Sequence, residues 1–191
     1  MLSSKVFCVL EAVSEEAKTA FQLPHNRRFL CHDVLEKSTE ETLPDGNRLI
    51  TEEVTERWKL VLPIEPRLYR HLALGVVVGS DHSSCDILLA TDNSQGIQGH
   101  HLSLGWDWAS EDPAHLIVKN HCEQGTNLYT TYWELVQSEE HVNPRNWNLI
   151  RIGPVTIGLS IDLDRDPEDY EEFAANWRQL RSCLLHCRHH D

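Results

Sequence analysis

The sequence predicts a mainly β protein, an antiparallel β-sandwich with a short N-terminal leader and a C-terminal amphipathic α-helix. Between Trp58 and Ile161, brief apolar or alternating runs are separated by clusters of Gly, Asn, Asp and Ser, which is the pattern of short strands joined by turns. No helical period lies between these runs, so the pattern favours a sandwich or barrel over a doubly wound sheet. The length of 191 residues fits one compact domain.

The chain divides into three parts by its patterning. Residues 1–57 are charge-mixed and weakly periodic, with Pro- and Gly-containing breaks at Leu23–Asn26 and Leu43–Asn47, and we interpret them as an adaptable leader with one or two short helices or strands. Residues 58–161 form the sandwich. Its expected strands, each bounded by turn residues, are Trp58–Leu62, Leu74–Val78, Asp86–Ala90, His101–Leu104, His115–Val118, Thr126–Thr130, Asn146–Ile150 and Val155–Ile161.

Residues 162–191 predict a terminal helix. Asp166 provides an N-cap and Pro167 occupies the first helical position, where a missing N–H costs nothing. Apolar residues then recur every three or four positions and form one stripe, which we expect to pack on the sandwich: Tyr170, Phe173, Ala174, Trp177, Leu180, Leu184 and Cys187.

The composition limits the classes of partner. Lys and Arg sum to 17 and Asp and Glu to 30, which gives a net charge of −13 at pH 7 with His neutral. A nucleic-acid partner is therefore not expected, because its phosphates require clustered cations. The apolar run Val6–Leu10 is too short for a signal peptide or a membrane span, and the six scattered Cys suit free thiols in a reducing compartment. We expect an intracellular protein, cytoplasmic or nuclear, with no membrane partner.

Three signatures follow one another in the central part of the chain. They are Gly75–Asp81 with the following Cys85–Leu89, then Ile97–Leu102, then Asn120–Thr126. Their order and spacing resemble the forkhead-associated (FHA) domain, whose pattern is a Gly-Arg after a hydrophobic strand, a Ser-x-x-His and an Asn-Gly-Thr. The variant found here looks like the divergent FHA modules at the N-terminus of fungal protein kinases. The resemblance covers roughly residues 58–161.

The resemblance implies an FHA-like β-sandwich that binds phosphothreonine peptides with loops at one end. It implies a protein–protein interaction module in signalling, such as a regulatory part of a kinase signalling protein, whose partner is a phosphorylated protein or peptide. By position in the family pattern, the residues at the phosphate end are Ser80, Gln98, Gly99 and His100. Those nearer the peptide backbone are Gln124 and Asn127.

The same resemblance assigns structural roles to four other residues. Gly79 permits a close backbone approach or a turn, and His101 is an inward hydrogen-bonding residue that braces the loops. Gly125 and Thr126 form the tight entry into the next strand.

Three substitutions change the chemistry of this expected site. Ser80 stands where the family has Arg, Gln98 where it has the phosphate-binding Ser, and Gln124 where it has Asn. Over residues 65–135 there are three cations against nine acids, so long-range attraction of a phosphopeptide is weak. Protonated His100 would add a cation, which predicts stronger phosphopeptide binding at pH 6 than at pH 8.

The alternative is a degenerate FHA scaffold that binds a partner independently of phosphate, with Trp106 and Trp108 or the terminal helix as its surface.

Enzyme chemistry is not expected. The sequence contains no P-loop, kinase catalytic loop or Gly-x-Ser-x-Gly element, so we predict no catalytic residue, no cofactor and no metal. A remote alternative is a small metal-dependent enzyme, because imidazoles and thiolates are good zinc ligands. Its candidate donors are His100, His101, His121 and Cys122, or the tail residues Cys183, His186, Cys187 and His190.

Overall fold

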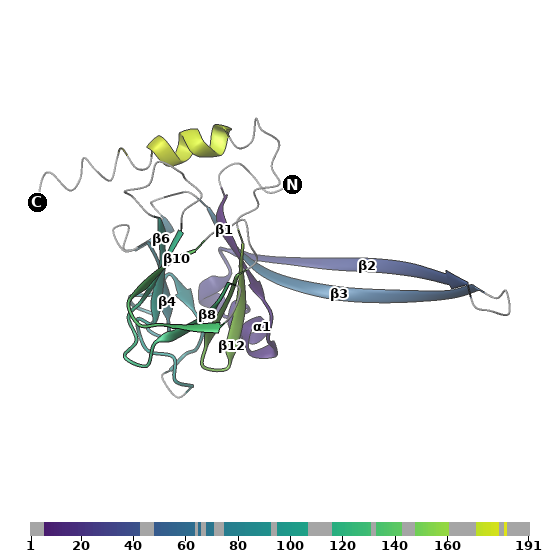
Figure 1. The fold of residues 1–191 in the computed structure, drawn as a ribbon, viewed down its shortest axis with the longest axis horizontal. Helices are drawn as coiled ribbons and strands as arrows, with labels where there is room; N and C mark the ends of the chain where they lie inside the picture. The colour runs from purple at the N-terminus through teal and green to yellow at the C-terminus, as the bar shows by residue number, and fades with distance from the viewer. Residues whose placement is uncertain are drawn as a thin grey trace, which may run out of the picture.

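The structure is a computed structural model that describes residues 6–42, 48–63, 65, 68–70, 75–92, 95–106, 116–130, 133–142, 148–160, 171–179 and 182. Within these residues the strands form two sheets, of seven and five strands, that enclose one hydrophobic core (Figure 1). The predicted mainly β sandwich with a C-terminal helix is therefore confirmed. None of the described helices has the length and apolar character needed to span a membrane.

The larger sheet is antiparallel throughout and includes the N-terminal strand as an inner strand. Leu10 lies opposite Leu60 on one side and Leu159 on the other. All three of these side chains are buried, since alternate residues of a strand face the core. The strand order is β2 (Leu30–Thr42), β3 (Arg48–Pro63), β1 (Val6–Ala12), β12 (Val155–Ser160), β11 (Asn148–Ile152), β8 (Thr126–Tyr129) and β9 (Trp133–Val136).

The smaller sheet carries the central signatures of the sequence. Its β4–β5 pair is parallel, with Val78 opposite Ile87, and its other pairs are antiparallel. The four residues of β4 are all buried, which explains the continuous apolar run Val76–Val78. The strand order is β10 (Glu139–Val142), β7 (Leu116–Asn120), β6 (Leu102–Trp106), β4 (Val76–Gly79) and β5 (Ile87–Leu88).

A short helix and a 3-10 turn connect β1 to β2 and close one side of the core. Ser14 is the N-cap of helix α1 (Glu15–Phe21), and its Oγ accepts a hydrogen bond from the Ala17 N–H at 3.2 Å. The 3-10 turn η1 (Pro24–Asn26) buries Asn26 completely. The Asn26 amide donates to the Ala20 and Leu88 carbonyls and accepts from the Leu88 N–H, so it joins this segment to β5.

A helix covers residues 171–179 and packs on the sandwich, as the apolar stripe predicts. Phe173, Ala174 and Trp177 are buried, and Trp177 belongs to the main core cluster. In Figure 1 this helix lies across one end of the sandwich. The predicted cap at Asp166 and the remaining members of the stripe lie outside the described residues.

The expectation of a separate leader over residues 1–57 was wrong. The boundary after residue 57 falls inside β3, and β1 lies between β3 and β12 in the sheet. The sequence did not indicate this strand as part of the sheet, because its apolar run stops at the charged Glu11. In the structure Glu11 is half-buried and accepts a hydrogen bond from the Arg57 Nε at 2.8 Å. Strands β9 and β10 were also missed, because each has four residues of which only the last, Val136 or Val142, is buried.

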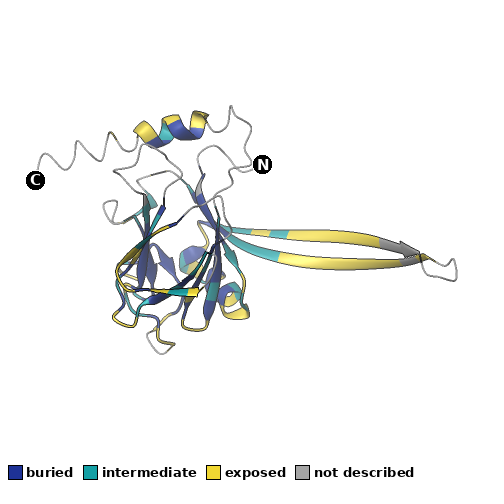
Figure 2. Ribbon diagram, viewed as in Figure 1, coloured by how far each residue is buried: buried dark blue, intermediate teal, exposed yellow. Residues whose placement is uncertain are grey.

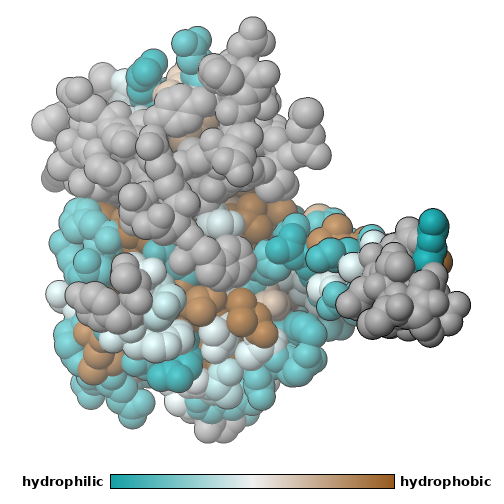
Figure 3. All heavy atoms as spheres, turned by 45° about the vertical axis from the view of Figure 1, so that its right-hand side comes forward, coloured by the Kyte–Doolittle hydropathy of each residue, from teal (hydrophilic) through white to brown (hydrophobic). Residues whose placement is uncertain are grey.

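The outer parts of β2 and β3 form a two-stranded ribbon that projects from the sandwich. The pairing continues without interruption from Leu30 opposite Leu60 to Thr42 opposite Arg48. We call residues 33–42 and 48–57 the arm, and the remaining described residues the body. The arm is mostly exposed (Figure 2) and shows apolar side chains beside hydrophilic ones (Figure 3). The exposed large hydrophobic residues of the arm are Val34, Leu35, Ile50 and Val54. The expected turn at Leu43–Asn47 lies outside the described residues.

Candidate functional site

The first two signatures occupy adjoining loops of the smaller sheet. The Ser80 N–H donates to the Gln98 and Gly99 carbonyls, both at 3.1 Å. Gly79 permits this approach, because a Cβ added there would lie 2.0 Å from the Gly99 oxygen. Hydrogen bonds therefore hold the β4–β5 loop directly against the β5–β6 loop.

His101 connects the second signature to the third. Its side chain is 2 % exposed, and its Nδ1 accepts a hydrogen bond from the Gln98 N–H at 3.2 Å. Its carbonyl accepts from the His121 N–H at 2.8 Å, in the β7–β8 loop. Burial lowers the pKa of His101, so this imidazole is neutral at pH 7 and serves as a structural brace.

Asn120 organises the β7–β8 loop and was not among the sequence-predicted site residues. Its side chain is 7 % exposed. The Nδ2 donates to the Cys122 carbonyl at 2.6 Å and the Gln137 carbonyl at 3.1 Å. The Oδ1 accepts from the Cys122 N–H at 3.2 Å and the Thr126 hydroxyl at 2.9 Å. An Asn at a strand end, shortly before a Gly-Thr, is the signal that identifies this turn-forming residue.

Gly125 and Thr126 form the end of this loop. Gly125 has a φ of +77°, in the left-handed region that favours glycine. Thr126 is fully buried, with its hydroxyl on Asn120. The three signatures, separated along the chain, therefore lie on three connected loops.

The residues expected at the phosphate end differ in how accessible they are. Ser80 is 6 % exposed, and its hydroxyl donates to the Ile97 carbonyl at 2.9 Å, so this hydroxyl proton is directed inward. Gln98 and Gly99 are half-buried, and His100 is exposed. The Gln98 amide and the His100 imidazole are thus the accessible side-chain groups of this set.

The two residues expected nearer the peptide backbone are separated by the fold. Gln124 is exposed in the β7–β8 loop. Asn127 lies on β8 between buried Thr126 and Leu128, so the alternation of a strand directs it to the outer face of the larger sheet. It pairs there with Arg151. The structure consequently places Gln124, and not Asn127, with the loop residues.

Asp81 adds a negative charge beside the candidate site. Its carboxylate accepts hydrogen bonds from the Ser83 N–H at 2.9 Å, the Ser83 hydroxyl at 2.7 Å and the Ser84 hydroxyl. The Ser84 and Ser83 bonds, with a smaller contribution from His100, lower the pKa of Asp81 to about 2. Asp81 is therefore ionised at neutral pH, and a phosphate bound here needs cations to offset it.

The alternative sites that the sequence offered, the metal-donor sets and the Trp surface, lie only partly among the described residues. No three His, Cys, Asp or Glu side chains among them are grouped closely enough to hold a metal ion. His121 instead contacts the Ser103 hydroxyl at 3.0 Å. The described cysteines are free thiols, namely Cys8, Cys31, Cys85 and Cys122. The Trp106 side chain, Trp108 and the tail donors from Cys183 onward lie outside the described residues.

Comparisons with known proteins gave no relative. No family model matches the sequence, and neither a curated protein nor a solved structure matches the chain.

Proposed function

We propose that this chain is a protein–protein interaction module of the FHA type that binds phosphothreonine-containing peptides with the three connected loops. The observation that carries the proposal is their arrangement: Ser80 contacts Gln98 and Gly99, and His101 contacts the residue that follows Asn120. Loops fixed on a rigid sandwich are suited to aim hydrogen-bond donors at a phosphate. The module acts inside the cell, without catalysis of its own, as the regulatory part of a kinase signalling protein.

The donors in this proposal are the Gln98 amide and the His100 imidazole. Both lie on the β5–β6 loop, which the buried His101 holds in place. The same loop end carries the ionised Asp81, so the bound phosphate needs donors from these loops to offset that charge. Stronger binding at pH 6 than at pH 8 stays a prediction from the sequence.

Fluorescence polarisation with a degenerate phosphothreonine peptide pool tests this proposal. We expect binding of the phosphorylated pool and none of the same pool without phosphate. Gln98→Ala and His100→Ala should each weaken binding by about fivefold or more, since each removes a hydrogen bond to a charged group. Gln179→Ala, an exposed Gln on the terminal helix, is the matched control and should bind as the unmodified chain does. Equal binding of both pools would contradict the proposal.

A second candidate function is phosphate-independent binding through the arm. Val34, Val54 and Ile50 share one face of the ribbon, because residues of equal parity lie on the same side of each paired strand. Each is at least 51 % exposed. The same face carries Glu36, Glu52 and Glu56. This combination of apolar and acidic residues fits a basic segment with alternating apolar side chains, and like charges oppose pairing with a second copy of the arm.

A pair of synthetic peptides tests the second candidate. A peptide of alternating Lys and Val should bind the chain, and one of alternating Glu and Val should not. Val54→Ser should weaken the first by about fivefold or more, since it removes a buried apolar contact. Val13→Ser is the control, because Val13 is 48 % exposed but lies outside the arm. Binding that is equal for both peptides, or unchanged by Val54→Ser, would exclude this surface.

A further inference from the structure

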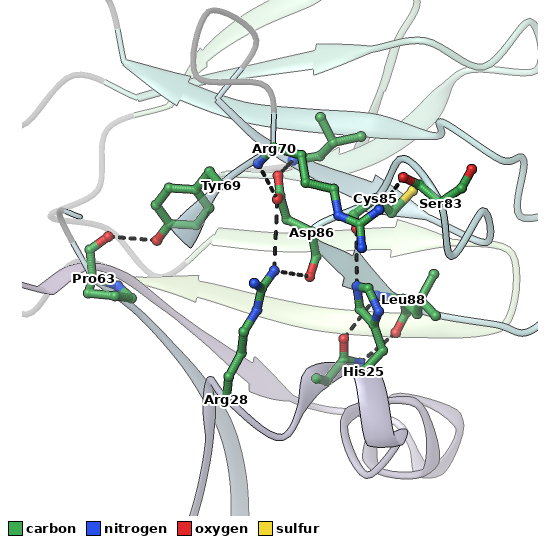
Figure 4. Close-up of polar contacts among 11 residues, drawn as sticks. His25, Arg28, Pro63, Tyr69, Arg70, Ser83, Cys85, Asp86 and Leu88 are labelled. Carbon is green, nitrogen blue, oxygen red and sulfur yellow. Dashed lines mark hydrogen bonds and ion pairs between the residues drawn. The ribbon is translucent and has the colours of Figure 1, made fainter. Parts of the chain in front are cut away.

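Basic side chains from separate segments surround the end of the β4–β5 loop, and Figure 4 shows three of them, those of His25, Arg28 and Arg70. They are Arg28, Arg70, His25 and His82, and we call them the cationic cluster. Arg28 and His25 come from that N-terminal segment, Arg70 precedes β4, and His82 lies in the loop itself. Residues distant in the sequence thus bring positive charge together in a chain whose net charge is −13.

Asp86 is the carboxylate that this cluster contacts, and it is occupied by internal hydrogen bonds. It is fully buried. Its Oδ1 accepts from the Arg70 backbone N–H at 2.8 Å and its Oδ2 from the Val77 N–H at 2.9 Å. The Arg28 Nη2 lies 3.9 Å from Oδ1. The Arg28 guanidinium therefore lies near this carboxylate, whereas the Arg70 guanidinium contacts the Ser83 carbonyl instead.

Contacts with the loop hold the basic side chains in place. The Arg28 Nη2 donates to the Asp86 carbonyl at 3.4 Å, and its guanidinium lies 4.5 Å from the centre of the Phe29 ring. The Arg70 Nη1 donates to the Ser83 carbonyl. The Arg28 side chain nevertheless remains 40 % exposed, and Arg70 is exposed. Both guanidinium groups can therefore donate further hydrogen bonds to a ligand from solvent.

The two imidazoles complete the cluster. The His25 Nε2 lies 3.0 Å from the Cys85 carbonyl, to which it donates. The His25 and His82 rings meet edge to face, with centroids 4.8 Å apart. The pKa of His25 is lowered, first by burial and then by the positive charges of His82, Arg28 and Arg70, against the effect of the Cys85 hydrogen bond. An anion bound among these groups would reverse the electrostatic part of that effect.

We propose that the cationic cluster is a binding site for a phosphoryl group. Two guanidinium groups with adjacent imidazoles provide the charge and the several donors that a phosphate monoester dianion requires. Cys85 joins this site to the loops described above, since its Sγ donates to the Gly99 carbonyl at 2.8 Å while its own carbonyl accepts from His25. The assignment of this phosphoryl group to a phosphothreonine peptide rests on the proposed function. The cluster then supplies the cations that Ser80 does not.

Titration with two probes tests the inference: inorganic phosphate, and the phosphothreonine peptide pool. The full chain is followed by NMR of its His ring signals, assigned with His25→Gln and His82→Gln. We expect both probes to shift the His25 and His82 signals and to raise the pKa of His25. The double variant Arg28→Gln/Arg70→Gln should weaken binding of both probes by about tenfold or more, because it removes charge-assisted hydrogen bonds. The control Arg151→Gln/Arg178→Gln removes two exposed cations elsewhere and leaves the same net charge.

If the double variant fails to fold, substitutions at the exposed His82 test the cationic cluster instead. His82→Arg should strengthen phosphate binding by about threefold, and His82→Glu should weaken it by a similar factor. If the peptide pool binds and neither the double variant nor the His82 substitutions change its affinity, the cluster is not the site and the proposed function stands. If inorganic phosphate shifts His25 and His82 but the pool does not bind, the cluster stands and the proposed function fails. No response to either probe would overturn both.

Discussion

The body and the arm consist of the same secondary structure, yet different interactions hold them. In the body, strands from both sheets bury side chains such as Leu10, Leu60 and Leu104 in one core. In the arm, the same strand β3 continues as one half of a ribbon whose Ile50 and Val54 are 61 % exposed. A two-stranded ribbon without a covered face is only marginally stable in water. Stability therefore resides in the body, and the arm contributes little to it.

The terminal helix should contribute the largest single-residue effect, because it packs on the sandwich through Trp177. Trp177→Ala removes a fully buried side chain from the core cluster and should lower the free energy of unfolding by about 4 kcal/mol. Urea denaturation followed by far-UV circular dichroism measures this. Trp133→Ala is the matched control, since Trp133 is 42 % exposed and should cost much less. Equal losses of unfolding free energy in the two variants would contradict the packing of this helix on the sandwich.

The β7–β8 loop should be nearly as sensitive, because a single side chain organises it. Asn120→Ala leaves the Thr126 hydroxyl and the Cys122 and Gln137 backbone groups without their partner. We expect a loss of about 3 kcal/mol in the free energy of unfolding. Asn127→Ala, on the outer face of β8, should change it by less than about 0.5 kcal/mol. A small loss at Asn120 would show that the loop is held by other contacts.

Acid should destabilise the body progressively. His101, His25 and His121 have lowered pKa values, chiefly through burial. As the pH falls below the unfolded pKa of about 6.5, the unfolded chain binds protons that the folded chain does not, so stability falls. A second loss follows below about pH 4, since the pKa of Asp81 is depressed to about 2 in the folded state. Thermal unfolding between pH 8 and pH 3 measures both steps, and a melting temperature that stayed constant from pH 7 to pH 5 would contradict the first.

Removal of the arm should have the smallest effect. Replacing residues 33–57 with Asn-Gly joins His32 to Trp58, which are paired residues, through a two-residue hairpin turn. The replacement removes the ion pairs Arg57–Glu11 and Lys59–Asp33, both partly exposed. The free energy of unfolding should change by about 1 kcal/mol or less. A chain that no longer folded without the arm would show that the arm stabilises the body.

The contrast between the buried strands of the body and the exposed strands of the arm explains which elements the sequence could predict. Turn residues and short apolar runs identified the strands from β4 onward that face the core, and the helical stripe identified Phe173 and Trp177. The leader was misassigned because β1 pairs with strands distant in the sequence and carries Glu11, whose partner Arg57 lies on β3. The arm was missed because its side chains face solvent on both sides, so no alternation marks it. Apolar residues alternate along a strand when one of its faces is buried. A strand that buries neither face has no such alternation in its sequence.

The candidate site was partly predictable for a related reason. The order of the signatures indicated three loops of one site, and Gly79, His101 and Asn120 connect those loops in the structure. Arg28 and Arg70 could not be found in this way. Arg28 approaches Asp86 because the N-terminal segment packs beside β5, an arrangement supported by the hydrogen bonds of Asn26. Arg70 approaches Asp86 through its own backbone N–H, from the segment before β4.

The most direct test of the account is a map of amide chemical-shift changes on addition of a phosphothreonine peptide selected from the pool. We expect changes in the three connected loops and in the His25–Arg28 segment that adjoins the β4–β5 loop, with the arm unaffected. Changes confined to the arm, or identical changes with the unphosphorylated peptide, would contradict the central claim that these loops recognise a phosphorylated partner.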